Sequence, residues 1–301
     1  MSSFEHPSNT RNRAAAIVAT AVAAALLAGC GGSGSNTTTT TTTAKVSPAD
    51  LSRAADVSSA ASGYRAVMTV SESVPGIGAL SLNGNGSFAK QQGQMTIAIK
   101  LPSALALVLG GQLQMAMVIH NGILYMKLPQ ALTSKVPGTK PWIEIDLRHS
   151  ASGSGGLSSL MSSSRQLSDP GQYFQWLHAI AGTGLQNLGS ATVNGVQTTH
   201  YHANVSLAQL MHASSAAGQP MVAQAEQQLS KQISGGTVPI DAYIDSSNLV
   251  RRVVIKESLS LAGKTSTSLI TVDFPQYGPQ AAPTVPPSSQ VTNFKALGNI
   301  P

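Results

Sequence analysis

The sequence predicts an α+β domain built on one large curved antiparallel β-sheet, with helices packed on its concave side. Three observations lead to this fold class. Apolar and polar residues alternate over about ten short segments, which is the pattern of half-buried strands. Asn-Gly pairs stand between several of these segments, and such pairs favour tight hairpin turns. Helical spacing interrupts the strands in only two places, which indicates an α+β arrangement.

The first 30 residues carry the features of a bacterial export signal. Arg11 and Arg13 precede an apolar run of 16 residues, 14–29. This run is shorter than the roughly 20 residues of a permanent transmembrane helix. It closes in Leu-Ala-Gly-Cys, and Cys30 is the only cysteine. The motif looks like a lipobox, so we expect lipid attachment at Cys30 and a location on the extracytoplasmic face of the cell membrane. The alternative is an unmodified cysteine after an ordinary signal peptide.

Composition divides the chain into four parts. Residues 1–29 are the expected signal peptide, and residues 30–46 are the lipidated cysteine with a Gly/Ser/Thr-rich tether. The seven-threonine run in this tether is either a bare spacer or a glycosylated segment. Residues 47–278 are the expected folded domain, and residues 279–301 are a proline-rich extended segment, which suits a sheet edge because proline cannot donate to a ladder.

The first half of the domain is expected to form one helix followed by strands. Ser47 can cap a helix that begins at Pro48 and runs to about residue 62. Asn83-Gly84 and Asn85-Gly86 are expected to mark a turn or bulge in the second strand, and Asn121-Gly122 is expected to form a hairpin turn. The expected strands are 64–72, 79–90, 94–101, 112–120, 123–128 and 140–147.

The second half is expected to contain helices between five further strands. After a Ser/Gly-rich loop over 150–164, a helix from Asp169-Pro170 carries an apolar stripe of Tyr173, Phe174, Trp176, Leu177 and Ile180. Further helices are expected over 206–210 and 221–233. The expected strands are 189–193, 196–205, 237–245, 249–259 and 264–274, with Asn194-Gly195 as a second tight turn.

The charge pattern argues against a nucleic-acid partner. Only 10% of the residues are charged, the formal net charge is +6, and no run of five basic residues occurs. A weak attraction to an anionic envelope surface is the most that this balance supports. Because the sole cysteine would be acylated, we expect a fold without disulfides whose stability comes from core burial.

Five segments, in this order, carry a resemblance to a known family: Val118–Lys127, Pro141–Asp146, Val193–Tyr201, Ile240–Ser246 and Asn248–Arg252. The chain resembles the LppX/LprG-type mycobacterial lipoproteins, a branch of the LolA-like fold, over about residues 50–275. Asp241 occupies the position of the acidic residue that usually begins the family's last sheet motif. The resemblance implies a half-barrel around a hydrophobic cavity that binds or carries acylated lipids.

No constellation in the sequence favours catalysis. Nucleophile elbows, zinc-protease motifs, phosphate loops and Cys-x-x-Cys pairs are absent. His200 and His202 share a strand face, either as half of a metal site or, more simply, as a solvated face. Glu144 and Asp146 likewise share a face and are interpreted as its polar side. We expect no enzyme, no catalytic residue, no cofactor and no metal; a hydrolase would require these residues to converge in a cleft.

The strongest candidate for a binding site is an apolar face of the predicted sheet. Residues from successive strands should line one face of the sheet, either as an ordinary core or as the wall of a ligand cavity, and methionine suits variable apolar contents. The segment 101–111 is either a buried connecting helix or a lid at the cavity mouth. The candidate cavity residues are Met95, Ile97, Ile99, Leu105, Leu109, Met115, Met117, Ile119, Leu124 and Met126.

Together these features predict a membrane-anchored extracytoplasmic lipoprotein that binds or carries an acylated lipid. The alternative is a cell-surface lipoprotein with a filled core that acts as a protein- or glycan-interaction module. The expected partners are the membrane through Cys30, a hydrophobic ligand, and an envelope transporter or other protein. We expect a monomer.

Overall fold

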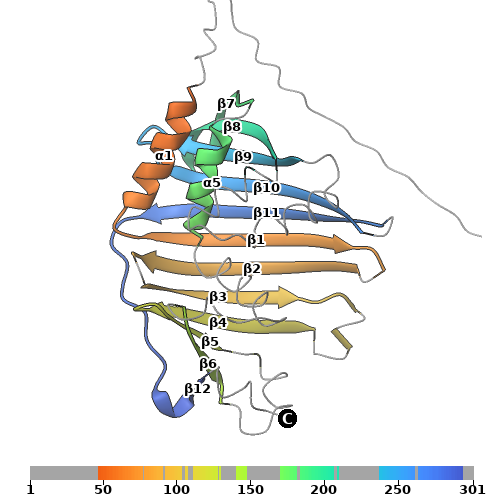
Figure 1. Cartoon of the computed structure of the whole chain (residues 1–301), viewed down its shortest axis with the longest axis vertical. Coiled ribbons are helices and arrows are strands. Elements are labelled where there is room, and N and C mark those ends of the chain that lie inside the picture. The colour runs from red at the N-terminus through yellow and green to blue at the C-terminus, as the bar shows by residue number, and fades with distance from the viewer. Residues whose placement is uncertain are drawn as a thin grey trace, which may run out of the picture. The chain divides into compact units, whose positions relative to one another are not determined.

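One twelve-stranded sheet runs through the part of the chain that the computed structural model describes (Figure 1). That part comprises residues 47–76, 78–90, 92–103, 106–107, 111–127, 129, 140–147, 170–181, 184–206, 209, 237–261 and 264–293. The helices are α1 (Pro48–Ala60), α5 (Gln172–Ile180) and the 3-10 turn η2 (Ser288–Gln290). The strands are β1 (Tyr64–Val74), β2 (Gly78–Ala89), β3 (Gln92–Lys100), β4 (Gln112–His120), β5 (Ile123–Lys127), β6 (Trp142–Asp146), β7 (Gln186–Val193), β8 (Val196–Ser206), β9 (Thr237–Asp245), β10 (Val250–Leu261), β11 (Lys264–Tyr277) and β12 (Val291–Asn293).

The strand order shows two meanders joined at the middle of the sheet. The order is β12-β6-β5-β4-β3-β2-β1-β11-β10-β9-β8-β7, so β1 pairs with β2 on one side and with β11 on the other. All pairs are antiparallel except β12 with β6, which are parallel. The predicted fold class is confirmed, with twelve strands in place of about ten and one parallel pair in an otherwise antiparallel sheet.

Two helices pack against one face of this sheet. Ser47 caps α1 by accepting a hydrogen bond from the Ala49 N–H (3.2 Å), as the sequence predicts. The buried Ser58 hydroxyl accepts a hydrogen bond from the Val250 N–H (3.0 Å), which ties α1 to the start of β10. Helix α5 lies beside α1 and buries the predicted apolar stripe. In Figure 1 both helices cross the half of the sheet that contains β8 to β11.

An aromatic cluster holds α5 to the centre of the sheet. The Phe174 ring of α5 lies 4.6 Å from the Phe274 ring on β11 and 5.6 Å from the Tyr64 ring on β1. Tyr64 also stacks on Phe88 of β2 at 5.4 Å and contacts Tyr277 at 6.3 Å. Offset and edge-to-face contacts of this kind contribute about 0.5–1.5 kcal/mol each beyond area burial. The cluster therefore fixes the helix over the β1–β11 seam.

The hairpin turns follow the sequence signals. Asn121-Gly122 and Asn194-Gly195 both have positive φ at the two central positions, as type I′ turns require, and each joins two paired strands. The third turn, between β9 and β10, depends on Asp245. Its carboxylate accepts hydrogen bonds from the Ser247 and Leu249 N–H groups, at 2.8 and 2.9 Å.

The expected turn or bulge at 83–86 is absent. Strand β2 pairs with β1 and with β3 in unbroken register through this stretch. Gly84 and Gly86 instead face the core, where larger neighbours occupy the space that side chains would fill. A Cβ at Gly86 would lie 2.9 Å from a ring carbon of Phe88 and 2.6 Å from the Gln94 carbonyl oxygen. These glycines serve packing, which sequence pattern alone does not separate from turn formation.

A C-terminal strap, residues 278–290, crosses the ends of the central strands and reaches β12 (Figure 1). The Gly278 N–H donates to the Gly63 carbonyl (2.9 Å) at its start. Pro283 and Pro286 are buried along it. Lys140 holds its far end by donating from Nζ to the Ser288 carbonyl (3.3 Å). The segment is extended, as its prolines predict, and β12 then forms the edge of the sheet beside β6.

Other predicted elements lie outside the described residues. These are the signal peptide and tether, Cys30, the 150–164 loop and the helix over 221–233. The start of the 206–210 helix is described at two positions. Ser206 and Gln209 exchange the hydrogen bonds of a capping box, at 3.0 and 3.2 Å between backbone N–H and side-chain oxygen. None of the described helices is long and apolar enough to cross a membrane.

The glycine packing gives a testable prediction. We expect Gly86→Ala to lower the free energy of unfolding by about 1–3 kcal/mol, because its Cβ meets a backbone oxygen that cannot move independently. Gly84→Ala is the matched control: its Cβ would meet the flexible end of Met95 at 3.2 Å, and we expect a smaller loss. Chemical denaturation of both variants tests this order, and equal destabilisation would contradict the packing role of Gly86.

Candidate functional site

Eight of the candidate cavity residues lie on the helix-bearing face of the sheet. Directly opposed residues of neighbouring strands share a face. Met95 of β3 opposes Met117 of β4, which opposes Met126 of β5, so three methionines form one row across three strands. Ile119 opposes Leu124 in the next row. We call the apolar face of β3, β4 and β5 the methionine-rich face. The residues on it are Met95, Ile97, Ile99, Met115, Met117, Ile119, Leu124 and Met126.

Burial differs along this face. Met95, Ile97, Met117 and Leu124 are at most 3% exposed, and Met126 is 6% exposed. Ile99, Met115 and Ile119 are only partly buried and pack against the core. The face therefore has a sealed centre and a less covered margin toward both strand ends. The ligand-cavity role of these residues stays a prediction.

The segment between β3 and β4 presents an exposed leucine. Leu107 is 90% exposed, the largest exposed fraction of the large apolar residues in the described chain. A helical turn precedes it, in which the Ala106 N–H donates to the Pro102 carbonyl (2.9 Å). Leu105 and Leu109 lie outside the described residues. Leu107 itself is thus not buried, and the role of segment 101–111 stays a prediction.

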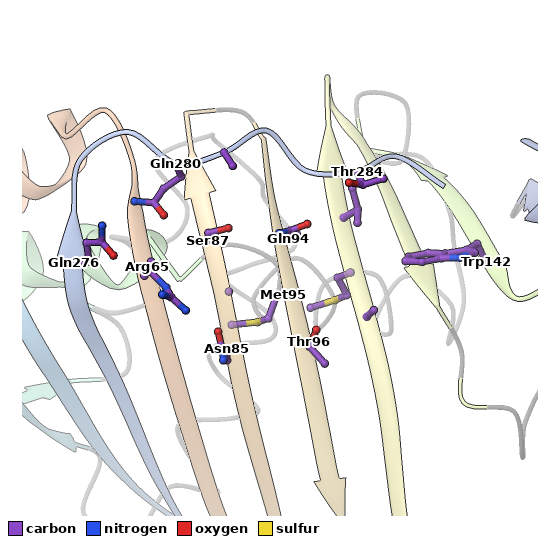
Figure 2. Close-up of a pocket in the computed structure, with 15 residues that line it drawn as sticks. Arg65, Asn85, Ser87, Gln94, Met95, Thr96, Trp142, Gln276, Gln280 and Thr284 are labelled. Carbon is purple, nitrogen blue, oxygen red and sulfur yellow. The ribbon is translucent and has the colours of Figure 1, made fainter. Parts of the chain in front are cut away.

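The opposite face of the sheet carries a polar groove of about 540 Å³, which we call the outer groove (Figure 2). It runs from Gln276 on β11 across β1 to β4 to Trp142 on β6. The strap lies along it and contributes Gln280 and Thr284. Residues that alternate with the buried core residues supply most of its polar side chains. They are Arg65, Asn85, Ser87, Gln94 and Thr96.

A second groove of about 760 Å³ lies toward the other ends of β1, β2, β9, β10 and β11. It contains Pro239 and the 42%-exposed Leu269. Glu72 and Glu257, which both oppose Ser268 in the register, also line it. Burial and the negative charge of Glu72 raise the pKa of Glu257. This groove mixes apolar walls with two carboxylates that lie in one cross-strand row.

His200 and His202 converge on Asp241, a partner that sequence reasoning missed. His200 Nε2 and His202 Nδ1 lie 3.0 and 2.9 Å from the same Asp241 oxygen, and Lys256 Nζ lies 3.6 Å from the other. The histidine side chains are about one-fifth exposed, so the strand face that was predicted to be solvated is partly buried and is occupied by this ion-pair cluster. Burial acts to raise the pKa of Asp241, but hydrogen bonds from both histidines and the Lys256 charge outweigh it and lower that pKa. Asp241 lies opposite His202 through the pairing register of β8 and β9, which sequence periodicity does not give.

The arrangement gives no support to hydrolysis. His200, His202 and Asp241 line neither groove, and neither do Glu144 and Asp146. Glu144 instead accepts a hydrogen bond from the Asn293 amide of β12 (3.3 Å). Within the described residues, no group of three His, Cys, Asp or Glu side chains is placed to hold a metal ion.

Comparison with known proteins finds similarity of structure only. No protein-family model matches the sequence, and no curated protein matches it. Lipoprotein LppX from Mycobacterium tuberculosis is similar at 13% identity and a TM-score of 0.41, covering 78% of this chain and 97% of that one. LprF from Mycobacterium bovis is similar at 16% identity and a TM-score of 0.41, and the match covers 79% of this chain and 95% of that one. A LolA superfamily protein from Nitrosomonas europaea is similar at 8% identity and a TM-score of 0.29, and the match covers 79% of this chain and 96% of that one.

The structural similarity expected from the hairpin segments is thus found, at low sequence identity. It concerns the fold. What the two faces of the sheet bind has to follow from the residues of this chain.

The Asp241 cluster predicts how stability depends on pH. Because the pKa of Asp241 is lowered in the folded protein, the ionised carboxylate stabilises the fold above about pH 4, and this contribution is lost as the pH falls through the lowered pKa. We expect Asp241→Asn to cost about 2 kcal/mol at neutral pH and to flatten the acid dependence. Asp56→Asn, at an exposed surface pair with His178, is the control and should cost less than about 0.5 kcal/mol. Urea denaturation between pH 2 and 7 measures both, and an unchanged acid dependence in Asp241→Asn would contradict the assignment.

Proposed function

We propose that this chain is a lipid-anchored protein of the cell envelope that holds an acylated lipid against the methionine-rich face. The observation that carries the proposal is the extent of the apolar face. It continues from the helix-covered strands β8 to β11 across β1 and β2 to Ile143 and Ile145 of β6. Helices α1 and α5 make their main sheet contacts with β10 and β8. The apolar surface is therefore broader than the area that the described helices cover.

The chemistry of this face suits acyl chains. Methionine side chains are unbranched and polarizable, so the Met95–Met117–Met126 row can repack around contents of varied shape. Removing a methylene group from water stabilises by about 0.8 kcal/mol, so a 16-carbon chain gains on the order of 12 kcal/mol at full burial. No directional contact is needed for such a ligand, in agreement with a face that consists of apolar side chains.

The anchor and tether support a location at the membrane. In this proposal Cys30 is diacylated after removal of residues 1–29, and residues 30–46 hold the 47–278 domain near the bilayer. The tether reaches about 56 Å at most, at about 3.3 Å for each of its 17 residues. A domain within that distance can exchange lipid with the membrane or with an envelope transporter.

The exposed Leu107 marks the mouth of the proposed cavity. It lies between β3 and β4, the two strands that carry Met95 and Met117, and segment 101–111 would meet the bilayer when lipid enters or leaves. Leu105 and Leu109 of the same segment are the proposed further contacts.

One observation favours the alternative, a filled-core interaction module. Met95, Ile97, Met117 and Leu124 are already sealed from water by the protein itself. If the whole face is filled in this way, the chain would act through its surface on a protein or glycan partner.

Lipid occupancy distinguishes the two functions. We expect residues 45–301, one compact unit, to retain lipid in native mass spectrometry, and organic extraction to release it. Met117→Trp should abolish retention by filling the centre of the face. Ala116→Trp, the adjacent residue with its side chain on the opposite face, is the control and should retain lipid. Circular dichroism checks folding, and Met117→Ala should keep the lipid. Repeated lipid-free preparations from a lipid-rich host would favour the filled-core module.

Leu107 gives a kinetic prediction. We expect Leu107→Glu to slow lipid transfer between vesicles at least several-fold while the melting temperature stays unchanged, because a charge resists entry into the bilayer. Leu188→Glu, at a 54%-exposed leucine on β7 at the far edge of the sheet, is the control and should transfer lipid normally. A fluorescent-lipid transfer assay measures both rates, and equal rates would remove segment 101–111 from the mechanism.

A further inference from the structure

The outer groove stands apart from the lipid proposal because it lies on the opposite face of the same strands. Strands lie about 4.8 Å apart, so a groove from β11 to β6 is on the order of 29 Å long. Its volume of about 540 Å³ falls within the range of roughly 300–1,000 Å³ for sites that bind small molecules. An elongated site of this size fits a short linear chain better than a compact molecule (Figure 2).

The side chains in the groove suit a ligand rich in hydroxyl groups. Asn85 and Gln94 carry amides, and Ser87 and Thr96 carry hydroxyls, so each can both donate and accept. Within the described part of the chain, no hydrogen bond engages the side chains of Arg65, Asn85 or Gln94. Their donors and acceptors are therefore available to a ligand. Among the described residues that line the groove, none carries a carboxylate and Arg65 is the single cation.

Other ligand classes fit this groove poorly. A peptide that adds a strand needs an open sheet edge, but β1 to β4 are each paired on both sides. A nucleic acid or other polyphosphate needs several cations, and Arg65 is the one cation among the lining residues that the structure describes. An acyl chain needs continuous apolar walls, whereas eight of the fifteen described lining residues of this groove are polar.

We propose that the outer groove is a carbohydrate-binding site for an oligosaccharide of neutral or mildly acidic sugars. Trp142 lies at one end of the groove, where its ring offers an apolar surface to the C–H face of a sugar and its indole N–H offers a donor (Figure 2). Asn85 and Gln94 bind hydroxyls along the middle, and Arg65 pairs with a hydroxyl or a uronate. This site does not depend on lipid carriage.

The strap forms one wall of the site. Gln280 and Thr284 line the groove from the strap, while the sheet supplies the floor. The Gly278–Gly63 and Lys140–Ser288 hydrogen bonds hold the strap at its two ends. A sugar chain in the groove would thus contact the sheet and the strap together.

The test uses defined probes on the full chain in detergent. Maltohexaose, mannohexaose, cellohexaose, chitohexaose and a hexamer of galacturonic acid are titrated by calorimetry and by saturation-transfer NMR. We expect at least one to bind, with Asn85→Ala and Gln94→Ala each weakening binding about three- to tenfold through loss of hydrogen bonds. Asn83→Ala is the matched control, with the same residue type on the same strand and face, outside the groove, and it should bind normally.

Each outcome decides the proposal. Binding of one hexamer that is weakened by Asn85→Ala but not by Asn83→Ala supports the site. Failure of all five probes at millimolar concentration, or equal binding by Asn85→Ala and Asn83→Ala, overturns it. Lipid content measured on the same samples separates this result from the lipid proposal, because the variants lie on the face opposite Met117.

Discussion

The structure depends on the mutual contact of three rings, Phe174, Tyr64 and Phe274. These rings join α5 to β1 and β11, the two strands where the N-terminal and C-terminal meanders meet. Three of the five phenylalanines in the chain lie in this aromatic cluster. Val250 adds a second junction nearby. Its N–H donates to Ser58 of α1, and its carbonyl accepts from the Tyr277 hydroxyl of β11 (2.6 Å). Both helices are thus fixed over one half of the sheet, and the apolar surface extends beyond them.

Along each strand, successive side chains point to opposite faces of the sheet, so the two faces differ in chemistry. On β3, Met95 is 2% exposed and belongs to the core although it also borders the outer groove, while the neighbouring Gln94 and Thr96 are exposed on the groove side. The same alternation places Met117 inside and Ala116 outside on β4. One set of strands can therefore present an apolar face and a polar groove without competition between them. Substitutions on one face are expected to leave the chemistry of the other intact, which is why the control variants can be taken from adjacent positions.

Local signals in the sequence predicted most of the elements. Asn121-Gly122 and Asn194-Gly195 have the positive φ that the pairs favour, and Ser47 caps α1. The prediction was wrong where a residue pair that is typical of a turn is instead required by packing against other residues. Asn85-Gly86 looks like a turn, but Gly86 is required by Phe88 and the Gln94 carbonyl. The Asp241 partner and the outer groove depend on cross-strand register and on where the strap lies, neither of which periodicity contains. Asp241 opposes His202 only because β8 and β9 pair in one particular register.

The two edges of the sheet carry features that hinder the addition of a further strand. An unpaired edge invites strand addition unless it is short, bulged or covered. At one edge β12 has only three residues and is continuous with the strap, whose prolines lack N–H donors. At the other edge β7 has a register shift between Asn187 and Gly189, where Gly189 has a φ of +95°. Both edges, as far as the structure describes them, are thus poor templates for a further strand. The strap therefore has two roles. It leads into the edge strand β12, and it forms one wall of the outer groove.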